Sequence, residues 1–181
     1  VIKTNGSIEP FHPQKLNQWA EYASKQGGNW SEIAMEVNRR LSGDVDSSVI
    51  HQTMINVCLE QEDMIHSRIA SRLEYGTLRK GMASVGLSDK HSFIQIIGTL
   101  CNLGVWDRNS LPSEGELIKA GVNEVYTRLY PTYLEYWQVK QFSDKYTLSY
   151  EGKSVETPLI AAMGLGLALH SDDIEKAMLL A

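Results

Sequence analysis

Apolar residues recur at helical spacing along most of this chain, and glycines separate one such segment from the next. Positions i, i+3, i+4 and i+7 share one face of an α-helix, so each segment predicts an amphipathic helix. The first runs from Pro13 toward Gly27, and three more have apolar faces within residues 30–41, 50–57 and 64–80. The sequence therefore predicts a mainly α fold assembled from short helices.

Two stretches depart from the helical period. Asn5 and Gly6 favour the positive φ angles of a tight turn, so residues 1–11 predict a β-hairpin. Alternating residues around the Glu151–Lys153 turn predict a second hairpin within 146–156. The fold class expected from the residues alone is mainly α with small β-hairpins.

Helices are expected in the second half of the chain as well. Ser113 and Glu116 form a capping box for one helix, and Pro131 is expected to begin another. Thr157 predicts the cap of an apolar helix, because a proline follows it at the first helical position. A last helix is expected from Ser171, and it stops without a cap, as we expect of a chain cut within a helix.

Composition excludes several classes of protein. The net charge of −5 argues against a general nucleic-acid binder, since such binding rests on neutralising phosphates. No apolar run is long enough to span a membrane and no signal segment opens the chain, so we expect a cytoplasmic protein.

Cys58 and Cys101 lie far apart without metal-ligand spacing, which predicts reduced thiols in the core. The histidines show no metal-binding spacing, and no nucleophile motif or Walker A motif is present, so we predict neither metal-binding nor catalytic residues.

A few charged residues suggest an anion site near the start of the chain. Lys3 lies in the first strand, Lys15 in the first helical turn and Lys80 near the end of the fourth helix. Ser47 begins the third helix, where free N–H groups and the helix dipole favour a phosphate. If these elements converge they suit a triphosphate, and Glu9 could then bind a base or ribose. Each lysine is also consistent with an ordinary solvated surface charge.

Four stretches occur in the order found in one known family. The opening "VIKTNGSIEPFHPQKL" resembles the start of the ATP-cone, the N-terminal regulatory domain of ribonucleotide reductase large subunits. The stretches "GDVDSSVIHQTMINV" and "SRIASRLEYGTLRK" are similar to the helix entry and the Leu-Arg-Lys helix end of that domain. The later "KYTLSYEGKSVETPLIAAMGLGLAL" resembles the entry into the reductase barrel.

The resemblance implies an organisation and a set of ligand-binding residues. It implies an ATP-cone of one hairpin and four helices over residues 1–83, a helical connection over 84–145 and the truncated start of an α/β barrel domain over 146–181. It implies that ATP or dATP, with Mg, is held by Lys3, Glu9, His12, Lys15, Ser47, His51 and Lys80. In this interpretation the lysines neutralise phosphates, and Glu9 binds the sugar or base.

The resemblance also implies an enzyme to which the chain belongs. That enzyme is a class I ribonucleoside-diphosphate reductase, an oxidoreductase that ATP activates and dATP inhibits. Its expected partners are the remainder of the large subunit, a radical-generating small subunit and further copies of itself. The family uses a radical-bearing cysteine and a redox-active pair, so Cys58 and Cys101 are too few for catalysis by these residues alone.

Several positions depart from the family pattern. Thr4 stands where a basic residue is frequent, His12 replaces Asn or Asp, Gly76 replaces an apolar side chain and Leu159 replaces Gln. The first three leave open an alternative, a degenerate cone that binds no nucleotide and serves as a subunit-interaction module. A cone-bearing transcription regulator is disfavoured, because such proteins begin with a zinc ribbon and this chain contains no paired CxxC motif.

Overall fold

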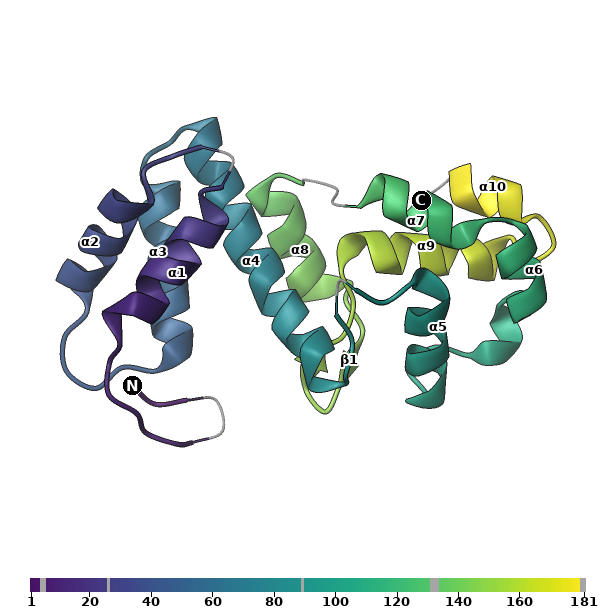
Figure 1. Cartoon of the computed structure of the whole chain (residues 1–181), viewed down its shortest axis with the longest axis horizontal. Helices are drawn as coiled ribbons and strands as arrows, with labels where there is room; N and C mark the ends of the chain where they lie inside the picture. Colours follow the sequence, from purple (N-terminus) through teal and green to yellow (C-terminus); the bar gives the residue numbers. More distant parts are fainter. Residues whose placement is uncertain (4–5, 26, 89, 131–133, 180–181) are drawn as a thin grey trace. The chain divides into compact units, whose positions relative to one another are not determined.

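The chain folds into two compact units made mostly of helices (Figure 1). A computed structural model describes residues 1–3, 6–25, 27–88, 90–130 and 134–179. One unit comprises residues 1–76 and 134–140, and the other comprises residues 77–133 and 141–181.

The elements follow the predicted order, except that η1 (Arg108–Ser110) and α7 (Val122–Leu129) were not predicted. They are α1 (Pro13–Ala23), α2 (Trp30–Arg40), α3 (Ser47–Leu59), α4 (Met64–Ser84), α5 (Phe93–Asn102), the 3-10 helix η1 (Arg108–Ser110), α6 (Glu114–Lys119), α7 (Val122–Leu129), α8 (Tyr136–Lys145), β1 (Ser149–Tyr150), β2 (Lys153–Ser154), α9 (Pro158–Leu169) and α10 (Ile174–Leu179). The prediction of a mainly α protein with a small antiparallel hairpin is confirmed.

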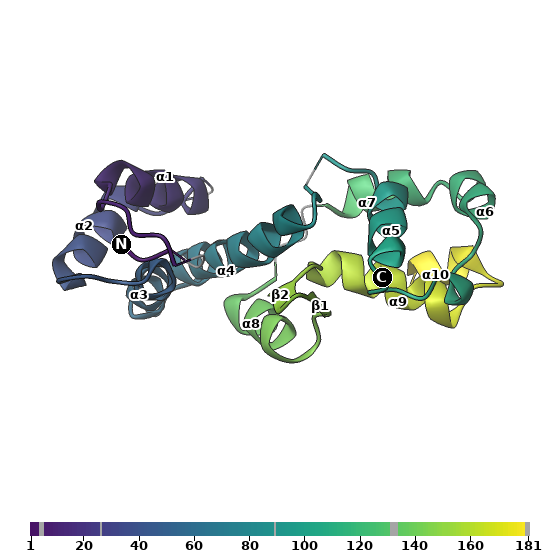
Figure 2. The ribbon, with the colours of Figure 1, turned by 90° about the horizontal axis from the view of Figure 1, so that it is seen from below.

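Helix α2 packs against both α1 and α3 in the first unit (Figures 1 and 2). Leu16, Ala20 and Ala23 lie on one face of α1 at the predicted spacing, and all three are buried. They join a core whose buried members also include Ile33, Ala34, Val37, Met54, Ile55, Val57, Cys58, Ile69, Ala70 and Leu73. The helical periods therefore identified most of the inward face of each helix, but Trp30 of α2 and Ile65 of α4, which the same periods place inward, are exposed.

Gly76, which departs from the family pattern, has a packing role in this unit. The ring of Trp19 lies directly over it, and a Cβ at position 76 would come within 2.5 Å of the Trp19 ring atom Cζ3. The indole also contacts the ring of His51 edge to face, with 5.6 Å between the ring centroids. The large indole and the small glycine are therefore matched in shape.

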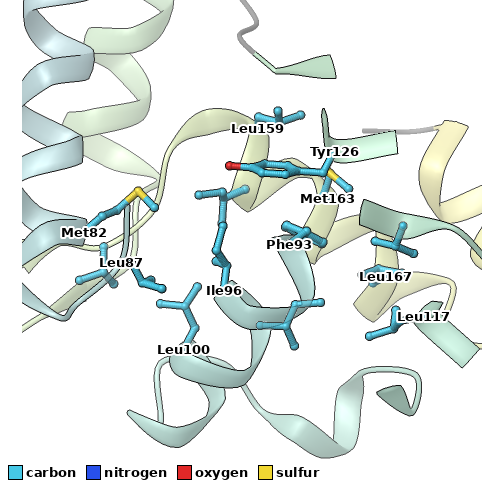
Figure 3. Close-up of a cluster of buried hydrophobic side chains, with 14 of the residues drawn as sticks. Met82, Leu87, Phe93, Ile96, Leu100, Leu117, Tyr126, Leu159, Met163 and Leu167 are labelled. Carbon is cyan, nitrogen blue, oxygen red and sulfur yellow. The ribbon is translucent and has the colours of Figure 1, made fainter. Parts of the chain in front are cut away.

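A separate hydrophobic core fills the second unit (Figure 3). Phe93, Ile96 and Leu100 of α5 meet Met163 of α9 and residues of α7 there, and these four side chains are buried. The rings of Phe93 and Tyr126 stack with centroids 5.3 Å apart. Burial of side chains this large is the main source of stability expected for the unit.

The local signals of the second half are largely confirmed. The capping box of Ser113 and Glu116 forms as predicted, and the β1–β2 hairpin turns at Glu151 and Gly152, both with positive φ. The predicted helix start at Pro131 lies outside the described residues, and α8 begins at Tyr136. The predicted Thr157 cap is the N-cap residue of α9, but its side chain makes no cap hydrogen bond.

The last helix begins later than predicted. It starts at Ile174 instead of Ser171, because residues 171 and 172 form a turn and the Asp173 carboxylate accepts from the Lys176 N–H, at 3.0 Å. Its predicted end at Leu180 and Ala181 lies outside the described residues.

Candidate functional site

The N-terminal hairpin places Lys3 and Glu9 on one face. Ile2 pairs with Ile8, the Lys3 N–H donates to the Ser7 carbonyl at 2.8 Å, and the Glu9 N–H donates to the Val1 carbonyl at 3.0 Å. Successive side chains of a strand point to opposite faces, so Lys3 and Glu9 share the face opposite the two isoleucines. Thr4, the last residue of the predicted strand, and Asn5, the predicted turn residue before Gly6, lie outside the described residues, and Gly6 has a φ of 79°.

Lys3 and Lys15 meet at a single oxygen atom of Glu9. The Glu9 Oε1 atom lies 2.8 Å from Lys3 Nζ and 2.7 Å from Lys15 Nζ. Lys15 reaches it from the first turn of α1, where its N–H donates to the His12 carbonyl at 3.0 Å. The side chains remain 31–55% exposed, so the cluster is accessible to a ligand. The structure thus brings three of the seven predicted site residues together.

The two ammonium groups hold Glu9 in its charged form. Hydrogen bonds from Lys15 and Lys3 lower the pKa of the carboxyl from 4.5 to about 2. The contribution of these pairs to stability is small because solvent screens them. That contribution is complete above about pH 4.5 and is lost as the pH falls through about 2, because the folded-state pKa is the lower one.

Carbon-13 NMR of the Glu9 side-chain carboxyl tests this ion pairing. We expect a titration midpoint near 2 in the unmodified chain. In a Lys15→Gln variant we expect the midpoint to move upward toward 4.5, because the strongest donor to the carboxylate is removed. A midpoint near 4.5 in the unmodified chain would show that the bridge does not persist in solution.

The start of α3 lies directly beside the same hairpin. The Ile2 N–H donates to the Val45 carbonyl at 3.0 Å, and the Ser47 N–H donates to the Ile2 carbonyl at 2.9 Å. Asp46, the N-cap residue, makes no side-chain cap hydrogen bond. The first N–H groups of a helix have no partner within the helix, so this end of α3 favours a negative charge. Ser47 therefore stands next to the strand that carries Lys3.

The two predicted histidines occupy different surroundings. His12 is the exposed N-cap residue of α1, and its side chain makes no cap hydrogen bond. His51 is half-buried, and its Nε2 atom lies 2.9 Å from the Leu73 carbonyl oxygen of α4. With its ring also against Trp19, His51 has structural contacts within the unit.

Lys80 is the seventh predicted site residue. It is exposed on the part of α4 that belongs to the second unit, whereas the Lys3, Glu9 and Lys15 cluster belongs to the first. Its convergence with that cluster stays a prediction.

The sequence patterns did not identify a pocket of about 480 Å³ beside Glu9. Ile8 and Phe11 line it from the hairpin side, and Asn38 and Leu41 line it from the end of α2. The positive φ of Gly43, 68°, lets the following loop turn toward this pocket. Gly43 is the only lining residue at which a local sequence pattern indicates a turn beside the pocket. The other lining residues come from separate helices and loops, so no local pattern groups them.

The possible metal ligands and the two cysteines have the following surroundings. Across the described ranges, no group of three or more His, Cys, Asp or Glu side chains could hold a metal ion. Cys58 is buried as predicted, and burial raises the pKa of its thiol to about 12. Cys101 is only partly buried, and desolvation raises its pKa as well. Neither thiol is activated as a nucleophile.

The comparison with known proteins agrees with the resemblance of the sequence motifs to a reductase large subunit. No family model matches the chain. The chain is similar to the ribonucleoside-diphosphate reductase subunit alpha of Enterobacteria phage T4, at 26% identity over 194 residues. The match covers 96% of this chain and 24% of the phage protein, so the chain spans about a quarter of that relative's length. No helix within the described residues is long and apolar enough to cross a membrane.

Proposed function

We propose that this chain is the nucleotide-sensing N-terminal part of a ribonucleoside-diphosphate reductase large subunit. One observation carries the proposal: Lys3 and Lys15, from separate elements, converge on one carboxylate oxygen. Similarity to a reductase alpha subunit along nearly the whole chain supports the same assignment. The ATP-cone is the proposed identity of the N-terminal region, and the α/β barrel start that of its C-terminal end.

Glu9 is proposed to occupy the place of a ligand phosphate until a nucleotide arrives. Two lysines facing one carboxylate carry an excess positive charge, which attracts a polyphosphate more strongly than it attracts a single carboxylate. As the lysines turn to the phosphates, the Glu9 carboxylate becomes available to accept a hydrogen bond from the sugar or base. Ser47 and the start of α3 would bind a further phosphate oxygen. Mg would neutralise part of the remaining negative charge.

The activity of the whole protein is proposed by the same reasoning. It would reduce ribonucleoside diphosphates, together with a radical-generating small subunit and the rest of the large subunit, as an oligomer in the cytoplasm. ATP would favour the active assembly and dATP the inhibited one, which is a coupling between distinct sites. No residue of this chain is assigned a catalytic role.

Calorimetric titration of the chain with ATP and dATP in the presence of Mg tests the proposal. We expect saturable binding of both, and weaker binding of tripolyphosphate, which lacks the sugar and base. Flat titrations with a folded protein would contradict the proposal and favour the degenerate cone that serves as an interaction module.

A further inference from the structure

The second unit contains a pocket of about 600 Å³ that the proposed nucleotide site does not use. Helix α9 forms one side of it, and the segment around η1 and the end of α8 with the residues after it form the others. Its lining includes Trp106, Leu111, Phe142, Leu148, Glu156 and Leu165. Pockets of 300 to 1,000 Å³ are the size at which proteins enclose small ligands.

Helix α9 presents apolar residues to this pocket as well as to the core. Ile160, Met163 and Leu167 are fully buried, and Figure 3 shows Met163 and Leu167 within the core of the unit. On the outward side, Leu165, which lines the pocket, is 61% exposed, and Leu169, which lies outside the pocket lining, is 67% exposed. A helix that is apolar on all sides is normally covered on all sides, so the pocket face of α9 lacks an expected contact.

The rigid wall of the pocket is the Trp106 side chain. A Cβ on Gly164 would overlap the Trp106 ring, so the indole lies against the bare backbone of α9. The indole Nε1–H donates to Glu156 Oε1 at 2.5 Å, and the Leu148 N–H donates to Glu156 Oε2 at 2.8 Å. These contacts fix both the ring and the carboxylate in place.

Glu156 gives the apolar pocket a specific polar group. The residue is only 2% exposed, yet it lines the pocket. A carboxylate has about four acceptor positions, and only two hydrogen bonds to it are described. Burial raises the pKa of Glu156, which is the effect of a charge without a full counter-charge.

The charges of the pocket select the kind of ligand. Among the described lining residues, Glu156 and Asp107 are acidic and none is lysine or arginine. We propose that this pocket binds a small molecule with an apolar, ring-sized body and one cationic nitrogen, which is directed at Glu156. Apolar burial on α9 and Trp106 then supplies affinity, and the carboxylate supplies selectivity for the cation.

The test is a titration of the nitrogen-15-labelled chain with 1-naphthylmethylamine, followed through the indole N–H resonances. We expect a saturable shift of the Trp106 resonance and none of the Trp19 resonance, which lies in the other unit. The neutral analogue 1-naphthylmethanol has nearly the same shape, and we expect it to bind about tenfold more weakly because it forms no charge-assisted hydrogen bond. Equal affinity for the amine and the alcohol would overturn the role of the cation. A Trp106 resonance that does not shift during the titration would overturn the proposal that this pocket binds the ligand.

A pocket-filling variant and its control separate binding in the pocket from general effects of substitution. Ala162→Phe fills the pocket from α9 and is expected to abolish the shift, whereas Ala83→Phe places the same side chain on an exposed position outside it. Glu156→Gln is expected to remove the preference for the amine over the alcohol, and Asp107→Asn serves as the second charge variant should Glu156→Gln fail to fold. Binding that survives Ala162→Phe would overturn the site. Self-association of the chain that Ala162→Phe abolishes would assign the face to a protein contact and overturn the small-molecule proposal.

Discussion

A Lys15→Gln variant is expected to bind ATP and dATP at least roughly tenfold more weakly than the unmodified chain, since a charge-assisted contact to phosphate is lost. Lys15 is the right residue to change because it lies at 55% exposure and takes no part in either hydrophobic core. Its removal therefore tests binding without disturbing the fold. Calorimetric titration, with circular dichroism as the check on folding, measures the result.

Lys25→Gln is the matched control for this variant. Lys25 is an exposed lysine of the same unit, and its ammonium lies 5.8 Å from the centroid of the Tyr22 ring, so the variant changes the net charge equally. We expect it to leave nucleotide affinity within about twofold, because charges at a distance are screened at physiological salt. Equal losses in both variants would show that only the overall charge matters and would refute the site.

A Gly81→Ala variant is expected to lose about 3 kcal/mol of unfolding free energy, at the upper end of overpacking effects. A Cβ on Gly81 of α4 would overlap the carbonyl oxygen of Ser154, a backbone atom of β2 within the same unit. Because a backbone carbonyl cannot rotate away as a flexible side chain can, the hairpin or the helix has to move. Urea denaturation followed by circular dichroism measures the loss.

Gly98→Ala is the matched control for this variant. Gly98 lies within α5 with no neighbouring atom where its Cβ would be placed. There the change is expected to stabilise the chain by about 0.5–1 kcal/mol, since alanine is the better helix former. A Gly81→Ala variant as stable as Gly98→Ala would show that β2 does not pack on α4 as described.

Part of the candidate site was predictable because its geometry is local. The pairing of Ile2 with Ile8 follows from a short hairpin, and alternation then places Lys3 and Glu9 on one face. Lys15 lies within reach because Pro13 begins α1 just after the hairpin. The bridge itself, with both ammonium groups on one oxygen, depends on the angle between hairpin and helix, which no sequence pattern specifies.

Other site features were not predictable from single residues. The ring of His51 contacts Trp19 and the Leu73 carbonyl, which no local pattern indicates, and its place beside a nucleotide stays a prediction. Gly76 was noted as a departure without a reason, and the reason is the Trp19 ring above it. Both contacts join helices that are far apart in the sequence, so only the packed unit reveals them.

The sequence by itself determined most of the helices, most of their inward faces, the capping box of α6 and the two hairpins. Each of these features depends on residues a few positions apart, whose spacing and backbone preferences can be recognised directly in the sequence. Only the tertiary structure decided that Ile2 pairs with the loop before α3, that Trp106 lies on Gly164 and that Glu156 is buried in a pocket. The physical reason is that these contacts depend on how whole helices pack. A local sequence pattern shows which side chains face inward, but many different inward-facing side chains could contact one another, and only close packing determines which of them do.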